Sequence, residues 1–338
     1  MYNLKKIRLH IGHWRLDRRF LKISLPKLTS EEKKLLKETW PCVSISPFDH
    51  TCIRVYKKFN GFSPYYLAPM WYNEIRAVVN PQKQLQALEN KAMCDIYFPQ
   101  LNFPESYVRK INGVFYDREM NILSEENVIK ILSQKEGFVI KPSIDSEQGK
   151  GVKIVKTKDE SVICKIINES DNNFIAQEII KQHSIISGLN ESSLNTFRVT
   201  SLYLNGKYNA VTSLKVGKKG SDRDNWDCSY WINVEKDGIL SEKGYDYNIN
   251  VVNKTDNGIA FSGLKMPMYD EMIRFVERNH KLLFPNCCVV GWDITIDITD
   301  NIRVIEVNLD TPGTKIEQLC NGDFFKMFRD DICILMKK

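Results

Sequence analysis

Three oxygen-bearing side chains near the C-terminus lie in two short runs that are typical of one β-hairpin. Asp293 belongs to an alternating polar and apolar run, and Glu306 and Asn308 end the following run. A two-residue turn at Asp300-Asn301 would place Asp293 opposite Asn308, with Glu306 on the same face. Two carboxylates and one amide oxygen predict a Mg2+ site completed by water and phosphate oxygens. The alternative is a solvated polar face.

A second segment combines a buried strand with a glycine-flanked lysine. Residues 138–142 read as a strand that contains Lys141, and Gly149-Lys150-Gly151 precedes a second strand. Glycines at these positions favour a loop whose backbone N–H groups fold around phosphate, with Lys141 and Lys150 supplying charge. The spacing differs from that of the Walker and dinucleotide motifs. Taken alone, such a segment is more often a surface turn.

The rest of the chain predicts how these segments are positioned. Its 338 residues, 43% hydrophobic and 27% charged, suit a globular protein of about two domains. A helix is predicted from Thr29 to Thr39, and helical patterns recur near 81–90, 124–135, 160–168 and 269–283. β-rich runs lie at 138–141, 152–156, 174–180, 197–204, 207–214, 230–235, 289–298 and 302–308. Asn205-Gly206 predicts a tight hairpin. The mixture predicts an α+β fold with largely antiparallel sheets.

Composition and charge exclude several classes of protein. No stretch reaches the ~20 apolar residues of a membrane span and no secretion signal is visible, so a cytoplasmic location is expected. Nine cysteines lack C-x-x-C or zinc spacing, which favours reduced thiols. Residues 4–22 form a basic amphipathic pattern, which would either dock on the protein or make a peripheral contact at the inner face of the membrane. No nucleic-acid-binding module accompanies the charge.

The order of these motifs along the chain is more specific than any one of them. Lys91, Lys141-Pro142, the Gly-Lys-Gly loop, Gln177-Glu178, Arg198, Asp293 and Glu306-x-Asn308 follow one another. This order resembles the ATP-grasp superfamily, and most closely the sugar-transfer-associated ATP-grasp family of polysaccharide biosynthesis. The resemblance implies two α+β subdomains that grip ATP, after a mainly helical N-terminal region. It places that region at 1–85, a lid subdomain with the phosphate loop at 86–180, and a subdomain with the Mg2+ site and acceptor side at 181–338.

The resemblance also implies a role for individual residues. It assigns ATP phosphates to Lys91, Lys141 and the Gly149–Gly151 loop, and adenine to the backbone of Gln177, Glu178, Ile179 and Ile180, with His183 at the ribose. It assigns charge neutralisation during phosphoryl transfer to Arg198, and Mg2+ to Asp293, Glu306 and Asn308. Asp224 and Asn225 would face the acceptor. Lys215 stands where the family has arginine, and Trp226 to Trp231 replace expected glycines.

The reaction implied is an ATP-dependent ligation. ATP would phosphorylate an acceptor carboxylate, expected to be a uronate sugar, and an amine would attack the resulting acyl phosphate. A kinase that phosphorylates a sugar hydroxyl is the alternative enzyme. A nucleotide-binding scaffold for a glycosyltransferase is the alternative without catalysis. The substrate class follows from the family setting and not from the residues.

Overall fold

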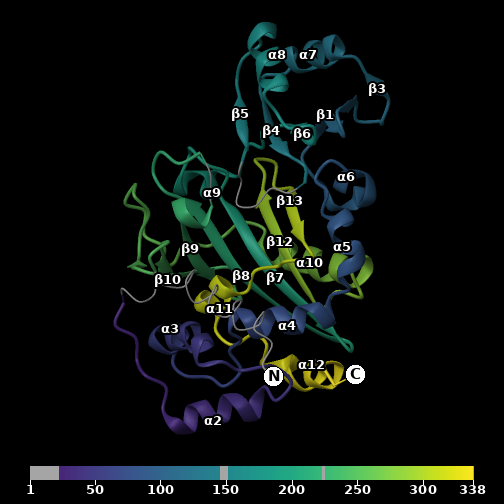
Figure 1. Cartoon of the computed structure of the whole chain (residues 1–338). Helices are drawn as coiled ribbons and strands as arrows, with labels where there is room; N and C mark the ends of the chain where they lie inside the picture. Colours follow the sequence, from purple (N-terminus) through teal and green to yellow (C-terminus); the bar gives the residue numbers. More distant parts are fainter. Residues whose placement is uncertain (1–22, 145–150, 223–224, 338) are drawn as a thin grey trace.

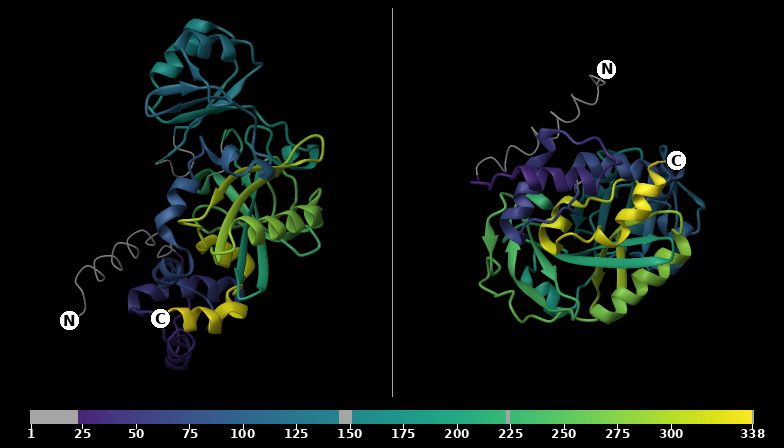
Figure 2. Two further views of the ribbon diagram at one scale, coloured as in Figure 1. Left: turned by 90° about the vertical axis from the view of Figure 1, so that its right-hand side faces the viewer. Right: turned by 90° about the horizontal axis from the view of Figure 1, so that it is seen from below.

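The fold is an α+β arrangement of two antiparallel sheets, as the sequence predicts. It is described by a computed structural model for residues 23–144, 151–222 and 225–337. In Figures 1 and 2 the small sheet and its two helices stand at one end of the molecule. The N-terminal helices lie at the other end, next to the C-terminus. The large sheet lies between them.

The small sheet has six strands in the order β3-β2-β1-β6-β4-β5, and all of its neighbouring strands are antiparallel. Two helices, α7 and α8, cover one face, where Val128 of α7 and Ile163 of α8 share a buried cluster with Phe138 of the sheet. Ser124 and Asp159 cap these helices and so set where each begins. The elements are β1 Ser106–Ile111, β2 Val114–Tyr116, β3 Ile122–Leu123, α7 Glu125–Ser133, β4 Phe138–Pro142, β5 Lys153–Val155, α8 Glu160–Asn168 and β6 Phe174–Gln177.

The large sheet has seven strands in the order β11-β10-β9-β8-β7-β12-β13. The predicted turn between β7 and β8 is confirmed, because Asn205 and Gly206 both have positive φ and Leu204 pairs with Lys207. The strands are β7 Thr196–Leu204, β8 Lys207–Gly217, β9 Ser229–Val234, β10 Leu240–Tyr245, β11 Val251–Val252, β12 Val289–Ile296 and β13 Ile302–Asn308. The helices on this part of the chain are α9 Ser184–Leu189, α10 Tyr269–Leu283, α11 Lys315–Asn321 and α12 Arg329–Leu335.

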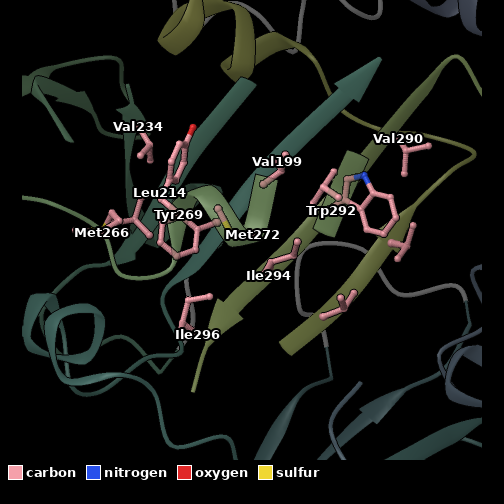
Figure 3. Packing of buried hydrophobic residues seen from close by; sticks show 14 of the residues in the cluster. Val199, Leu214, Val234, Met266, Tyr269, Met272, Val290, Trp292, Ile294 and Ile296 are labelled. Carbon is pink, nitrogen blue, oxygen red and sulfur yellow. The ribbon is translucent and has the colours of Figure 1, made fainter. Parts of the chain in front are cut away.

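One face of the large sheet is apolar and packs against α10. Val199, Leu214, Trp292 and Ile294 point into this core, where they meet Met272 of α10 (Figure 3). Side chains alternate along a strand, so the neighbouring residues of β7, β8 and β12 point to the other face. Arg198, Lys215 and Asp293 are among those neighbours.

The other face is covered by the N-terminal helices together with α11 and α12. Trp40, Tyr56 and Trp71 of the N-terminal region share one buried cluster with Leu202 of β7 and Phe325 near the C-terminus. A capping box at Thr29 begins the first of these helices, as predicted. These helices are α2 Ser30–Thr39, α3 His50–Asn60 and α4 Pro69–Val79. Helices α5 Gln82–Leu88 and α6 Cys94–Tyr97 follow them, and Leu85 of α5 belongs to the buried cluster on the α10 face. The predicted residue boundaries between domains remain predictions.

No helix in the described ranges combines the length and the apolar character that a bilayer crossing requires. The basic segment 4–22 lies outside the residues that the structure describes.

Candidate active site

A buried ion cluster lies on the face of the large sheet that α11 covers. Arg198 is paired with Asp293 across β7 and β12 and donates two hydrogen bonds to its carboxylate, each 2.8 Å long. Lys215 of β8 adds a third contact, with its Nζ 2.9 Å from Asp293 Oδ1. Burial alone would raise the pKa of Asp293, but the charges and hydrogen bonds of Arg198 and Lys215 hold it well below its ordinary value. The carboxylate is therefore ionised at neutral pH.

A second acid, Glu317, joins this cluster from the first turn of α11. Its side chain is 3% exposed and its Oε1 lies 3.7 Å from Arg198 Nη1. Burial raises the pKa of Glu317 to about 6, against the opposing effect of Arg198. Sequence reasoning missed this residue, because an acid in the first turn of a short helix is a common stabiliser of the helix dipole.

Two lysines and an acid meet where the small sheet faces the large one. Lys91 Nζ lies 2.8 Å from Glu306 Oε1, and the Lys91 backbone N–H donates to Ser143 O beyond β4. Lys141 of β4 and Glu306 of β13 line the same cavity, of about 10 Å3. Burial and the nearby charge of Lys91 lower the pKa of Lys141 to about 8, with Glu306 opposing. Because the cavity is so small, a nucleotide would enter only if the sheets separate or these side chains move.

The predicted hinge after β6 is tied to both sheets. Glu178 accepts a hydrogen bond from the Glu105 N–H (2.8 Å) and contacts Arg303 of β13. Gln177 is buried in the cavity wall, where its Oε1 has no hydrogen-bond partner among the described residues. Ile179 and Ile180 lie half-buried outside any strand. These two residues join β6 of the small sheet to Lys181, whose carbonyl accepts the N–H of Ile298 in the loop between β12 and β13.

The hairpin of β12 and β13 corrects the predicted register. Asp293 pairs with Glu306, and Asn308 pairs with Gly291 and not with Asp293. The expected two-residue turn was wrong, because Ile296 pairs with Ile302 and the loop runs from Asp297 to Asn301. Asp297 Oδ1 holds this longer loop by accepting the N–H groups of Thr299 and Asn301.

The corrected register still places Asp293, Glu306 and Asn308 on one face, because directly paired residues and residues two apart share a face. In the part of the chain that the structure describes, no group of three or more His, Cys, Asp or Glu side chains could hold a metal ion. The predicted metal set contains only two such side chains, with an amide as the third ligand. Its role as a metal site stays a prediction.

Glu89 is a further site residue that the sequence analysis did not single out. Its Oε1 accepts the backbone N–H groups of Leu309 and Asp310, the second at 2.7 Å. Burial raises the pKa of Glu89, with these two hydrogen bonds opposing. Glu89 thus fixes the chain immediately after Asn308. In the sequence Glu89 stands two residues before Lys91, and this closeness is the feature that could have indicated its place in the site.

The remaining predicted residues are less informative. His183 begins α9, where its Nδ1 accepts the Ile185 N–H, and its Nε2 lies 3.6 Å from Asp300 in the hairpin loop. Gly151 has a φ of +77°, which favours glycine, and a Cβ there would lie 2.8 Å from Pro142. Asn225 precedes a short 3-10 helix at 226–228. Gly149, Lys150 and Asp224 lie outside the described residues.

Comparison with known families identifies the relationship. The family model described as sugar-transfer associated ATP-grasp matches residues 73–331, which contain both charged clusters. The chain belongs to this family. Its fold is accordingly the ATP-grasp fold, with the helical N-terminal region that the sequence predicts. No curated protein matches the chain.

Several solved structures are similar to this chain at low sequence identity. D-alanyl-alanine synthetase A from Vibrio cholerae is 12% identical, over 73% of this chain and 65% of that chain, with a TM-score of 0.43. D-alanine-D-alanine ligase from Helicobacter pylori is 12% identical over 73% and 60%, at 0.41. Carboxyaminoimidazole ribonucleotide synthase from Aspergillus clavatus, complexed with ATP, is 11% identical over 68% and 46%, at 0.41. This chain thus spans about half to two thirds of the length of these three proteins.

Proposed function

We propose that the protein is an ATP-dependent carboxylate–amine ligase of bacterial surface-polysaccharide assembly. In this reaction ATP phosphorylates an acceptor carboxylate, and an amine attacks the acyl phosphate. Phosphate leaves and an amide forms, with one amine proton lost. The observation that carries the proposal is the pair of clusters described above. One pairs Lys91 with Glu306 beside Lys141, and the other gathers Arg198, Lys215 and Asp293. The family resemblance assigns Lys91 and Lys141 to the ATP phosphates, Arg198 to charge neutralisation, and Asp293 and Glu306 to Mg2+.

The first cluster suits the phosphates of ATP. Lys91 is at present paired with Glu306, so a phosphate oxygen can replace that partner without leaving the ammonium group buried alone. Burial already lowers the pKa of Lys141. The negative charge of a phosphate beside it would raise that pKa and so restore the charged form of the lysine. The backbone of residues 177–180 would then meet adenine, and His183 would lie on the ribose side.

The second cluster suits the transferred phosphoryl group. Asp293 holds the Arg198 guanidinium in a bidentate orientation, and this places the positive charge in the site before nucleotide and Mg2+ bind. Lys215 keeps a positive charge where an arginine was expected, with Asp293 as its partner. Catalysis would therefore depend on positioning and electrostatics, and no side-chain nucleophile is required.

The chain also offers a suitable donor set for Mg2+. Asp293, Glu306 and Asn308 provide hard oxygen ligands, and the low pKa of Asp293 keeps its carboxylate ionised. These three residues would hold the ion, which when bound neutralises charge on the phosphates. The carboxylates of Asp293 and Glu306 now contact Arg198, Lys215 and Lys91, so ion binding would be accompanied by a change of partners.

Turnover of ATP with a panel of uronate sugars and amines tests the proposal. A ligase releases free phosphate only when both a sugar carboxylate and an amine are present. A kinase would leave phosphate on a sugar hydroxyl, which mass spectrometry of the product would detect. Tight binding of Mg2+-ATP with no turnover over the whole panel would favour the scaffold for a glycosyltransferase and would contradict the ligase proposal.

Lys141 predicts a specific pH dependence of ATP binding. Its pKa of about 8 lies below the ordinary 10.5, so the free protein loses this charge as the pH rises through 8. Phosphate binds the protonated form, so binding above pH 8 requires proton uptake. We expect ATP affinity to fall by up to about tenfold per pH unit above that value.

Calorimetry at about pH 7 and about pH 9 would measure this fall in affinity. The variant Lys141→Arg should flatten the pH profile, because guanidinium stays charged. An equally steep fall in Lys141→Arg would contradict the assignment.

A further inference from the structure

Two cysteines from opposite ends of the sequence meet beside the helices α2 and α12. Cys42 follows α2 and Cys333 belongs to α12, and their Sγ atoms lie 3.0 Å apart. Both helices lie at the end of the molecule opposite the small sheet (Figure 1). The two residues are free thiols in the structure. A disulfide has an S–S distance of about 2.05 Å, so closing the bond would require a movement of only about 1 Å.

The surrounding chain holds this pair of thiols in place. Arg329, the first residue of α12, donates a hydrogen bond from Nε to the backbone oxygen of Thr39, the last residue of α2, at 2.6 Å. Cys333 belongs to the buried cluster that contains Trp40, and Cys42 packs against that cluster. Because both cysteines are positioned by folded segments, forming the bond would need little further ordering of the chain.

The two thiols differ in how easily an oxidant can reach them. Cys42 is half-buried, whereas Cys333 is only 6% exposed. Other cysteines of the chain direct their sulfur atoms to oxygen. Cys94 donates to the Asn90 backbone oxygen at 3.2 Å. The geometry therefore favours Cys42 as the thiol that reacts first and Cys333 as the thiol that completes the bond.

We propose that Cys42 and Cys333 form a disulfide that joins the segment after α2 to α12 under oxidising conditions. The oxidant is a small disulfide such as oxidised glutathione. The Cys42 thiolate attacks one sulfur atom of the oxidant, its S–S bond breaks, and one glutathione thiolate leaves. The Cys333 thiolate then attacks the Cys42 sulfur of the mixed disulfide and displaces the second glutathione. The two protein thiols lose two electrons to the oxidant, and the leaving thiolates take up their two protons.

The environment of Cys42 makes this a slow reaction. Burial and the contact with the Cys333 thiol raise the pKa of Cys42, and the nearby charge of Arg329 opposes this effect. Only the thiolate attacks a disulfide, so few molecules are reactive at any moment at neutral pH. The bond would thus form under sustained oxidation and would not serve as a rapid sensor. Neither cysteine belongs to the charged clusters, so this inference is independent of the ligase proposal.

The expected consequence is a more stable protein. The bond would join residues that stand 291 positions apart, and it would therefore restrict most of the unfolded chain. We expect the melting temperature of the oxidised wild-type protein to rise by about 5 °C, and dithiothreitol should reverse this rise.

Peptide mapping without reduction tests the inference directly. The full-length protein is incubated overnight with oxidised glutathione, denatured in urea with iodoacetamide present, and digested with trypsin. We expect the peptide of residues 38–54 to be joined to that of residues 330–337, and dithiothreitol should separate them. The first peptide also contains Cys52, so tandem mass spectrometry has to place the bond at Cys42.

Three variants sharpen the assignment. Cys42→Ser and Cys333→Ser should each abolish the joined peptides and the reversible rise in melting temperature. Cys164→Ser is the matched control, since Cys164 is also half-buried but lies in α8 with its Sγ 3.6 Å from Glu125 Oε1. This control should form the bond as the wild type does.

Several results would overturn the inference. These are iodoacetamide or glutathione on both cysteines of the oxidised wild type, a bond placed at Cys52, and a bond that joins two chains into a covalent dimer in non-reducing electrophoresis. If the serine variants fail to fold, the peptide map of the wild type and its reversible change in melting temperature still decide the question.

Discussion

Replacing Glu306 with alanine is expected to lower ATP-dependent phosphate release by about a thousandfold, equivalent to ~4 kcal/mol in the activation barrier. Glu306 is a proposed Mg2+ ligand and is also the partner of Lys91. Without it, Lys91 and Lys141 keep their positive charges beside the phosphates. We therefore expect nucleotide binding measured without Mg2+ to stay within about tenfold of the wild type. A large loss of turnover together with little loss of nucleotide binding is therefore the result that would support the proposed role of Glu306.

The matched control for this variant is Glu277→Ala. Glu277 also pairs with a lysine, at 2.6 Å from Lys281, but on the exposed side of α10. Its loss should leave phosphate release unchanged, because a surface ion pair contributes about 0–1 kcal/mol to stability and this one is remote from the site. Turnover by Glu306→Ala within tenfold of the wild type would contradict both its metal role and the proposed reaction centre.

Replacing Asp293 with alanine is expected to lower the free energy of unfolding by about 3–5 kcal/mol. The variant leaves Arg198 and Lys215 without the carboxylate that both contact, and their side chains are only 13% and 9% exposed. A buried charge that loses its partner is more costly than the absence of the pair. Urea denaturation with EDTA present would measure the loss without any contribution from a bound metal ion.

Two further variants show whether this loss comes from unpaired charge. Adding Arg198→Met to Asp293→Ala should recover part of the stability, since it removes the guanidinium that has lost its nearest carboxylate. Asp330→Ala, which breaks an exposed pair with Arg329, should change the unfolding free energy by less than about 0.5 kcal/mol. A loss below about 1 kcal/mol in Asp293→Ala would mean that water already solvates the cluster.

The sequence predicted the elements with strong local patterns. The β-rich runs at 197–204 and 207–214 became β7 and β8 because Asn205-Gly206 fixes both their turn and their register. The amphipathic pattern near 269–283 became α10, whose Met272 and Val276 pack on the sheet. Where local chemistry alone determines the structure, as at these turns and faces, a single sequence suffices.

Features that depend on contacts between residues far apart in the sequence were less predictable. The register of β12 and β13 depends on the Asp297 side chain, which stabilises a longer loop than the Asp300-Asn301 pair suggested. The N-terminal region was expected to be mainly helical, but the bounds of helices α3 and α4 were not predicted, because burial of Tyr56 and Trp71 against distant parts of the chain stabilises both. Glu89 and Glu317 are ordinary acids in sequence and become site residues only through contacts across more than 100 positions.

The buried cluster shared by the two chain ends means that the folding unit is longer than the family segment. That segment begins at residue 73, inside α4. Gln318 of α11 exchanges two hydrogen bonds with the backbone of Leu67, at 2.8 and 2.9 Å, and Asn60 binds Leu319 O. These contacts hold the helix that presents Glu317. A chain trimmed to the family segment would expose the inner surface of α11 and α12 to water, and the buried cluster of Arg198, Asp293 and Glu317 would lose the support of the helix that contributes Glu317.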